Sequence, residues 1–225
     1  MIELSDVAVS FGGRSLFQDV SLSLPAGSFH FLTGPSGAGK TTLIRLCSLE
    51  MRPTEGRVEL FGETTVGVRG NALAAFRQRI GVVHQDSRFI DHLSLRENIM
   101  LPVSVAGAES GEAEENLAQL LGWVGLAEQA GQLPTEVSGG ERQRAALARA
   151  VILSPDLILA DEPTGNVDWE MSLRLLDLLV ELNRLGKTIL CATHDMNLIR
   201  QAKSRVSTRV LRIRGGDVAL AGAEL

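Results

Sequence analysis

A glycine-rich stretch with one lysine and two hydroxyl groups is the part of the sequence best suited to chemistry. It reads GPSGAGKT, follows an apolar run that ends at Thr33, and leads into the helical run TTLIRLCSLEM. Glycines let consecutive backbone N–H groups turn toward one point, and with the N-terminus of a following helix these donors form an anion site. The spacing Gly34, four residues, Gly39-Lys40-Thr41 fits the phosphate-binding pattern between strand and helix. The residues predicted to hold phosphate are Gly34, Pro35, Ser36, Gly37, Ala38, Gly39, Lys40, Thr41 and Thr42.

The same loop predicts how a nucleotide and its metal ion are bound. Lys40 is expected to reach the β- and γ-phosphates, and the Thr41 hydroxyl is expected to bind Mg²⁺. A second metal ligand is expected at the end of the apolar run LILAD, where Asp161 would hold Mg²⁺ through water. Glu162 would then lie beside the γ-phosphate and polarise the attacking water. Without other motifs, Asp161 and Glu162 would be interpreted as the ordinary solvated end of a strand. Because the same sequence also contains the phosphate loop, we favour the catalytic interpretation.

A third motif, VSGGERQR, combines a helix cap with two glycines. Ser138 and Glu141 have the spacing of a capping box, so a helix is expected to begin here whatever else the motif does. Two adjacent glycines at a helix start are unfavourable for capping alone. They leave bare N–H groups that a second phosphate could use, and the predicted nucleotide-binding residues therefore also include Ser138, Gly139, Gly140 and Glu141.

The order of four motifs resembles the nucleotide-binding domain of ABC-type ATPases. The motifs are GPSGAGKT, SGGE, LADEPTGN and ATHD, and the resemblance covers nearly the whole chain. It implies an α/β fold of the P-loop NTPase class, with a RecA-like core, an antiparallel β subdomain and an inserted α-helical subdomain. It also implies that two copies face head-to-tail, with each ATP between the phosphate loop of one subunit and the SGGE segment of the other.

The resemblance assigns roles to residues that would be uninformative alone. Gln85 is expected to sense Mg²⁺ and water, Asp168 to lie at the dimer seam, and His194 to contact the γ-phosphate. Phe11 precedes the first turn and is the expected adenine platform, because an aromatic face can stack on a base. An ordinary strand phenylalanine is the alternative for this position. The expected catalytic residues are Glu162, His194, Gln85 and Asp168, and the expected metal ligands are Thr41, Gln85 and Asp161.

Finer similarity points to the bacterial cell-division branch of this family. The supporting stretches include RQRIGVVHQDSRFIDHLSLRENIMLPVSVAGA, ADEPTGNVD and CATHDMNLI. This resemblance implies a peripheral subunit on the cytoplasmic face of the inner membrane, held by an integral membrane partner that activates cell-wall hydrolases, with other division proteins as further candidate partners. The partner is expected to contact residues 85–102. The alternative is the ATPase subunit of a lipoprotein-release or macrolide-type export transporter.

The elements that must position these residues follow from the hydrophobic pattern. Residues 1–33 predict strands broken by turns, and the apolar runs LILAD and TILCAT predict strands buried on both faces of a parallel sheet. Between about residues 87 and 138 a helical insertion is predicted, with helical spacing in LSLRENIMLPVSVAG and GEAEENLAQLLGWVGL. Helical spacing is predicted again in ERQRAALARAVIL and WEMSLRLLDLLVELNRLG. One domain is predicted over 1–225, with 1–86 and 146–225 as the core and β subdomain and 87–145 as the helical subdomain.

Composition agrees with an ordinary globular protein. The 225 residues are 44% hydrophobic and carry a net charge of −5, which does not favour a surface that wraps nucleic acid, so no nucleic-acid partner is expected. Cys47 and Cys191 lie in apolar surroundings and are expected to be buried thiols. No apolar run approaches the roughly 20 residues of a membrane helix, so the chain is expected to be cytoplasmic.

Overall fold

The centre of the fold is a mainly parallel sheet. Its strands are β3 (Phe29–Thr33), β6 (Ile80–Val83), β7 (Leu157–Asp161), β8 (Thr188–Ala192), β9 (Thr208–Arg214) and β10 (Asp217–Leu220). The computed structural model describes residues 1–108 and 110–221, so residues 222–225 of the predicted domain lie outside it. Within the described chain the strand order is β10-β9-β3-β8-β7-β6, with β10 antiparallel to β9 and the other neighbours parallel. Every residue of β3, β7 and β8 is buried, which explains why their sequences are mainly apolar.

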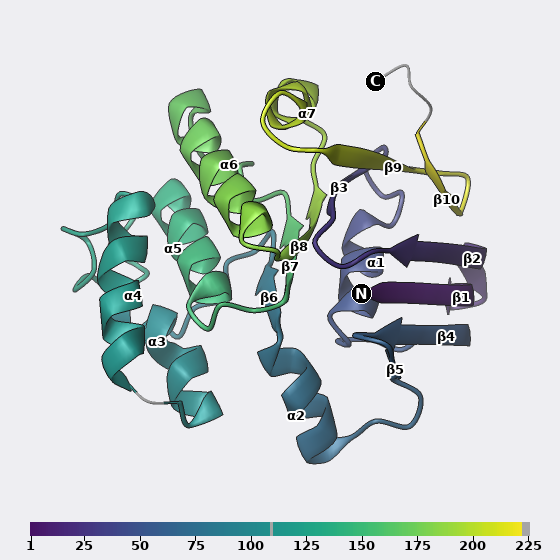
Figure 1. Cartoon of the computed structure of the whole chain (residues 1–225), viewed down its shortest axis with the longest axis horizontal. Helices are drawn as coiled ribbons and strands as arrows, with labels where there is room; N and C mark the ends of the chain where they lie inside the picture. The colour runs from purple at the N-terminus through teal and green to yellow at the C-terminus, as the bar shows by residue number, and fades with distance from the viewer. Residues whose placement is uncertain (109, 222–225) are drawn as a thin grey trace.

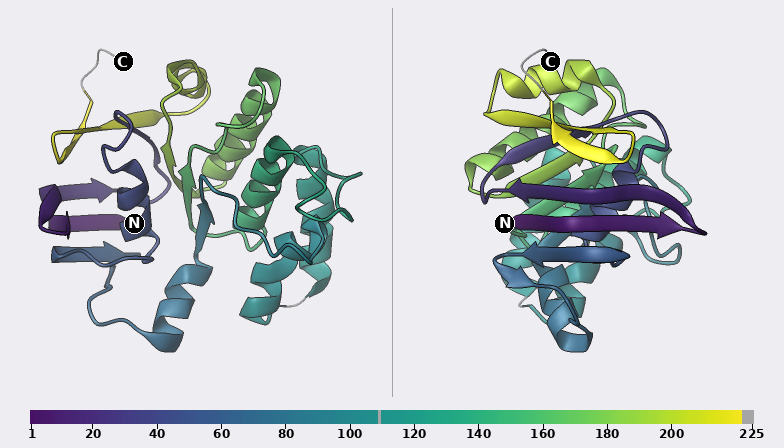
Figure 2. Two further views of the ribbon diagram at one scale, coloured as in Figure 1. Left: turned by 180° about the vertical axis from the view of Figure 1, so that it is seen from behind. Right: turned by 90° about the vertical axis from the view of Figure 1, so that its right-hand side faces the viewer.

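A second, antiparallel sheet lies beside the first. Its strands are β1 (Ile2–Phe11), β2 (Arg14–Leu24), β4 (Glu55–Leu60) and β5 (Glu63–Thr64), in the order β2-β1-β4-β5. Along much of β1, buried side chains alternate with exposed ones, as its sequence predicts. Figure 2 shows the face of this sheet in its right-hand view, where the hairpin β9–β10 lies beside β2.

Helices cover both faces of the central sheet. They are α1 (Lys40–Cys47), α2 (Gly70–Gln78), α3 (Leu95–Ala106), α4 (Ser110–Trp123), α5 (Gly139–Val151), α6 (Trp169–Arg184) and α7 (Met196–Lys203). Helix α1 lies between the two sheets, whereas α5 and α6 lie on the opposite face of the central sheet with α3 and α4 beyond them (Figure 1). Strand β7 divides the two cores, because Leu157 and Leu159 belong to the core around α1, and Ile158 and Ala160 belong to the core of helices α3–α7.

Two helices, α2 and α7, are not predicted from the sequence. Helix α2 begins at Gly70 and has no side-chain hydrogen bond at its N-cap, so it lacks the usual signal for a helix start. Helix α7 could have been predicted from Asp195, because aspartate is a favoured N-cap residue. In the structure the Asp195 carboxylate accepts hydrogen bonds from the N–H groups of Asn197 and Leu198. The predicted subdomain boundary between residues 145 and 146 falls within the continuous helix α5.

The parallel strands bring distant segments of the chain to one edge of the sheet. Strands β3, β6, β7 and β8 run in the same direction, so the residues that follow their carboxyl ends become neighbours. Gly34 follows β3, Gln85 lies two residues beyond β6, Glu162 follows β7, and His194 lies two residues beyond β8. The predicted α/β architecture with a parallel sheet is therefore present, and it gathers the candidate catalytic residues.

Candidate active site

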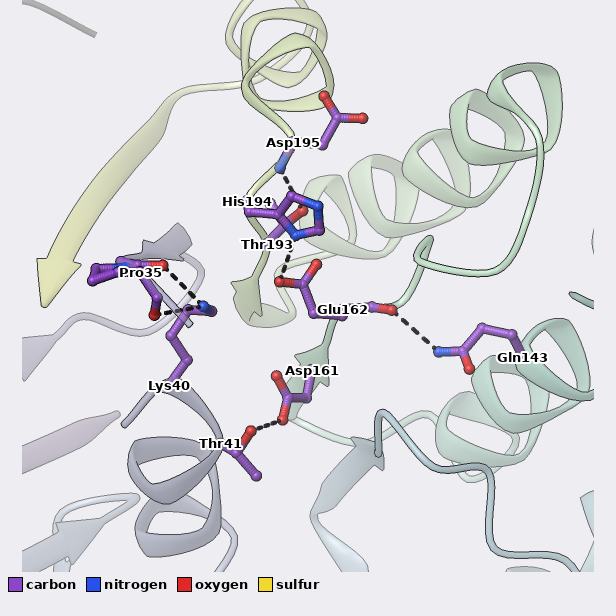
Figure 3. A network of polar contacts seen from close by, with 10 residues as sticks. Pro35, Lys40, Thr41, Gln143, Asp161, Glu162, Thr193, His194 and Asp195 are labelled. Carbon is purple, nitrogen blue, oxygen red and sulfur yellow. Dashed lines mark hydrogen bonds and ion pairs between the residues drawn. The ribbon is translucent and has the colours of Figure 1, made fainter. Parts of the chain in front are cut away.

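A cleft of about 700 Å³ lies at the carboxyl edge of the central sheet. It brings together most of the residues predicted for phosphate binding and catalysis, several of which are shown in Figure 3. The predicted residues in its lining are Gly34, Pro35, Ser36, Gly37, Gly39, Lys40, Thr41, Thr42, Gln85, Asp161, Glu162 and His194. The lining also includes Leu16, Gly165 and Asn166, to which the sequence assigned no role. The last two belong to the LADEPTGN motif, which was a usable signal.

The loop between β3 and α1 depends on a glycine at its end. Gly39 has a φ of 106°, and a Cβ at this position would lie 2.6 Å from Cζ of Phe17, so a larger residue would force a displacement. Helix α1 begins directly afterwards at Lys40, and its first N–H groups, which have no partner within the helix, border the cleft. The Lys40 ammonium donates to the carbonyl oxygens of Gly34 at 2.9 Å and Pro35 at 3.4 Å. It therefore lies over the loop that would hold a phosphate.

Thr41 and Asp161 form the oxygen pair predicted for a metal ion. Thr41 Oγ1 donates to Asp161 Oδ2 at 2.6 Å, although 120 positions separate the two residues in the sequence. Burial raises the pKa of the Asp161 carboxyl group, while the Thr41 hydrogen bond and the charge of Lys40 act in the opposite direction. A divalent cation would favour the ionised carboxylate. A hydroxyl and a carboxylate are hard oxygen ligands, so the residues present fit Mg²⁺ with waters completing its shell.

Glu162 has an unusual backbone conformation at the end of β7. Its φ is 49°, in the left-handed region that residues other than glycine rarely adopt. Its N–H donates to the carbonyl oxygen of Ala192 at 2.9 Å. Its carboxylate Oε1 lies 2.9 Å from Nδ1 of His194, and the Glu162 side chain is 13% exposed while that of His194 is 76% exposed. This arrangement can orient a carboxylate in the cleft so that it accepts a proton from water.

The SGGE segment begins α5 beside the loop that follows β7. The Glu141 N–H donates to Ser138 Oγ at 3.2 Å and the Ser138 N–H donates to the Glu141 carboxylate at 2.8 Å, which is the predicted capping box. The Ser138 hydroxyl also donates to the Glu141 carboxylate, at 2.7 Å, and this bond together with that from the Ser138 N–H lowers the pKa of Glu141. A Cβ on Gly140 would lie 2.8 Å from the carbonyl oxygen of Asn166, so the start of α5 packs closely against that loop. Residues 138–141, all described, lie outside the cleft lining of their own chain.

Three further predicted residues also lie outside the cleft lining. Phe11 ends β1 and is 53% exposed, whereas the side chain from this hairpin that lines the cleft is Leu16. Ala38 packs against the core between the two sheets. Asp168 is exposed and caps α6, because its Oδ1 accepts a hydrogen bond from the Met171 N–H at 2.8 Å. The adenine contact of Phe11 and the dimer-seam role of Asp168 stay predictions.

Arg142 and His84, which lie in or beside the motifs, have defined local contacts. Arg142 donates through Nη1 to the carbonyl oxygens of Pro134 at 3.0 Å and Val137 at 2.8 Å, which ties the loop before α5 to the helix. His84 Nε2 lies 3.4 Å from a carboxylate oxygen of Glu50. Burial lowers the pKa of His84, so this imidazole is mainly neutral at pH 7. These contacts of Arg142 and His84 involve none of the side chains predicted to act as catalytic residues.

Both cysteines are structural, as the sequence predicts. Cys47 on α1 and Cys191 on β8 are buried and free. Burial raises the pKa of the Cys47 thiol to about 12 and also raises that of Cys191. Both thiols are therefore un-ionised near neutral pH and act as small core residues.

Comparison with known proteins defines the class to which this fold and cleft belong. The family model described as "ABC transporter" matches residues 17–165. The chain belongs to this family of ATPases, and its reaction is the hydrolysis of ATP. A solved structure described as the dimeric post-hydrolysis state of the ATP-binding cassette MJ0796, bound to ADP and Pi, is 33% identical, has a TM-score of 0.88, and covers 97% of this chain and 96% of that chain. The predicted fold class and enzymatic activity are confirmed.

Curated relatives include cell-division and import proteins. The cell division ATP-binding protein FtsE of Haemophilus influenzae is 41% identical over 203 residues, which are 89% of this chain and 93% of that protein. The FtsE protein of Escherichia coli is 39% identical over 97% of both chains. The methionine import ATP-binding protein MetN 2 of Salmonella choleraesuis is 38% identical over 99% of this chain and 66% of that protein.

Proposed function

We propose that the chain is the ATPase subunit of a membrane complex of the FtsE type, acting in bacterial cell division. The observation that carries this proposal is the match to FtsE proteins at 39–41% identity over 89–97% of the chain. The import protein MetN 2 has similar identity, but the match covers a smaller share of that protein, 66%. Transport of a solute is therefore the alternative that an experiment must exclude.

Hydrolysis is assigned to groups that the cleft already holds together. Glu162 accepts a proton from the attacking water, and His194 orients its carboxylate through their 2.9 Å contact. Lys40 exchanges its bonds to the loop carbonyls for oxygens of the β- and γ-phosphates. Mg²⁺, when bound, offsets the negative charge on the phosphate oxygens. The residues proposed to hold this ion are Thr41, Asp161 and Gln85.

The proposed assembly is a head-to-tail homodimer with ATP at each interface. The solved relative MJ0796 supports it, because that cassette is described as dimeric. In this chain the SGGE segment lies outside its own cleft, so its N–H groups are available to a nucleotide bound by a second copy. The residues proposed to act from the second copy are Ser138, Gly139, Gly140 and Glu141, with Asp168 at the seam.

A second hollow fits the contact with the membrane partner. A groove of about 580 Å³ lies between α2, β6, α3 and α5. Val105 in its wall is 80% exposed, and with the other apolar side chains of the groove it offers a surface suited to docking. Within the expected segment 85–102, all of it described, Pro102 alone lines this groove, while Phe89 packs against the helical core beneath the Arg149 guanidinium. The apolar lining includes Leu73, Val82, Pro102, Val105 and Leu153.

The proposed partner is an FtsX-like integral membrane protein that docks in this groove. In the described part of the chain, no helix has the length and apolar character needed to cross a bilayer. The chain is therefore proposed to lie on the cytoplasmic face of the inner membrane through its partner. Closure of the dimer on ATP would move that partner and activate cell-wall hydrolases outside, with other division proteins as further contacts.

Affinity capture tests this proposal. Tagged Glu162→Gln, captured from detergent-solubilised membranes in Mg-ATP, is expected to retain an FtsX-like membrane protein that mass spectrometry identifies. The substitution removes the proton acceptor while leaving the phosphate site intact, so the ATP-bound complex accumulates. Lys40→Ala is the control, because it lacks the ammonium group for the phosphates and is expected to recover less of the partner.

The identity of the captured subunit decides between the two functions. Recovery of a lipoprotein-release or export permease in place of an FtsX-like protein would contradict the cell-division proposal and assign the chain to transport. The ATP-site assignments would be unaffected by that result, because they depend on the cleft and not on the partner.

A further inference from the structure

A buried glutamine on α5 contacts two of the segments that carry the proposed catalytic groups. Gln143 is 1% exposed. Its Oε1 accepts a hydrogen bond from Ser87 Oγ at 3.3 Å, and its Nε2 donates to the backbone carbonyl oxygen of Glu162 at 3.4 Å. Figure 3 shows the second contact, with the amide reaching from α5 to the end of β7. Ser87 lies two residues after Gln85, so one side chain joins the segments that follow β6 and β7.

The polar character of this side chain is not explained by core packing. Ala145, Ala146 and Leu147, which follow it on α5, are fully or almost fully buried and apolar. A buried amide is unfavourable unless its polar atoms are bonded, and an apolar residue of similar size would avoid that penalty. Both amide groups of Gln143 have partners, and neither partner belongs to α5. The position therefore uses hydrogen bonding to connect α5 with the edge of the cleft.

The Gln143 amide bonds to the backbone of Glu162, a residue with an unfavourable backbone conformation. With a φ of 49°, Glu162 occupies a backbone conformation that persists only when its surroundings hold it. On the β8 side its N–H donates to the carbonyl oxygen of Ala192. On the α5 side its carbonyl oxygen accepts from Gln143. The same oxygen also accepts from the Gly165 N–H at 3.1 Å within the loop. The three bonds together fix the orientation of this residue, and hence the direction in which its carboxylate leaves the backbone toward the cleft.

We propose that Gln143 is a positioning residue for ATP hydrolysis, which holds the Glu162 backbone so that its carboxylate points at the attacking water. This inference rests on the proposed role of Glu162 as the proton acceptor. Gln143 is not among the described residues that line the cleft, and the hydrogen bonds of its side chain go to Ser87 and Glu162, so we expect it to act on the reaction step and not on nucleotide binding. Because α5 begins with the SGGE segment, Gln143 also links that segment to the base within one subunit.

Steady-state kinetics of Gln143→Met and Gln143→Glu test the proposal. Methionine keeps the length of the side chain without a donor, and glutamate keeps an acceptor for Ser87 but lacks the N–H for the Glu162 carbonyl. In both variants kcat is expected to fall by about tenfold or more, because a small misplacement of a reacting group lowers the rate strongly. The Kd for Mg-ATP, measured by nucleotide fluorescence, is expected to change by less than about twofold.

Two controls make the outcomes separable. Gln119→Met changes an exposed glutamine on α4 and is expected to keep the parent kcat. Glu162→Gln is assayed in parallel, and if it keeps its activity, the assignment of Glu162 as the base is wrong. If Glu162→Gln is inactive while both Gln143 variants keep the parent kcat, the positioning role of Gln143 is wrong. Weakening of ATP binding in proportion to kcat would also overturn the proposal. If Gln143→Met fails to fold, Gln143→Asn, which stays polar and uncharged but is one methylene shorter, decides the question.

Discussion

At the scale of single residues, the charged groups of the cleft already have protein partners. The Lys40 ammonium bonds to the carbonyl oxygen of Gly34, and His194 contacts the carboxylate of Glu162. An ammonium group gains more from ionised phosphate oxygens than from neutral carbonyl oxygens, so ATP would readily draw Lys40 away from the loop. The Glu162–His194 contact needs no such exchange, because the proposed base is already oriented in the structure.

Glu162→Gln is expected to lower the hydrolysis rate on the order of 10²- to 10³-fold while leaving Mg-ATP binding intact. The amide has nearly the shape of the carboxylate but cannot accept the proton from water. Phosphate release measures the rate, and size-exclusion chromatography in saturating Mg-ATP measures assembly, since the trapped variant is expected to elute as a dimer. Retained hydrolysis would exclude Glu162 as the base, and a monomer in Mg-ATP would count against the sandwich assembly.

Residues in local motifs could be predicted from the sequence, whereas residues defined by distant contacts could not. The Gly34–Thr41 loop and the Ser138–Glu141 capping box depend on neighbours within a few positions, and the structure shows the expected loop and cap. Gln143 has a role only through residues 56 positions before it and 19 positions after it. Nothing in its local sequence reports those contacts.

At the scale of elements, α5 and the segment after β7 behave as one packed unit. Gly140 at the start of α5 lies against the Asn166 carbonyl, and three residues later Gln143 bonds to the Glu162 carbonyl. Strands β3, β7 and β8 were predictable because they are buried on both faces and their sequences are mainly apolar. Helix α2 was not, because it begins with a glycine and has no capping side chain at its start.

Gly140→Ala is expected to destabilise the protein, although alanine is the better helix former. The new Cβ would lie 2.8 Å from the backbone oxygen of Asn166, and overpacking of this kind costs about 1–3 kcal/mol against a helix-propensity gain of about 1 kcal/mol. Urea unfolding measures the difference. The matched control is Gly122→Ala on α4, where a Cβ meets nothing within 4 Å and a gain of up to about 1 kcal/mol is expected. Equal stabilisation in both variants would show that the α5 contact is not tight.

At the scale of the whole molecule, the central sheet lies between two hydrophobic cores. The core around α1 joins the two sheets, and the other joins the sheet to the helices. The buried polar residue His30 lies on β3 in the middle of this arrangement, 1% exposed and with its Nδ1 lacking a partner among the described residues. Burial, with a smaller contribution from Arg209, lowers the pKa of His30 to about 4.

Because of His30, the protein is expected to become less stable as the pH falls. Its pKa in the folded state lies below the ordinary value of 6.5, so the unfolded chain takes up the proton first as pH falls. The contribution of His30 to the free energy of unfolding is fully present above pH 6.5. It is lost between pH 6.5 and 4, by up to about 3 kcal/mol, as the unfolded chain is protonated. Comparing urea unfolding of the parent and His30→Leu at several pH values checks this expectation. The variant should show a shallower loss, and an unchanged slope would mean that another group controls acid unfolding.

The position of β3 in the sheet has a consequence for synthesis of the protein on the ribosome. Strand β3, which leads into the phosphate loop, has β8 on one side and β9 on the other. Both neighbours come from residues 188–214, long after β3 itself has been translated. The strand that supports the phosphate loop thus has no partner in the central sheet until those residues emerge, so a nascent chain lacking them holds no complete ATP site. Such incomplete chains would not compete with finished subunits for nucleotide or for places in the assembled complex.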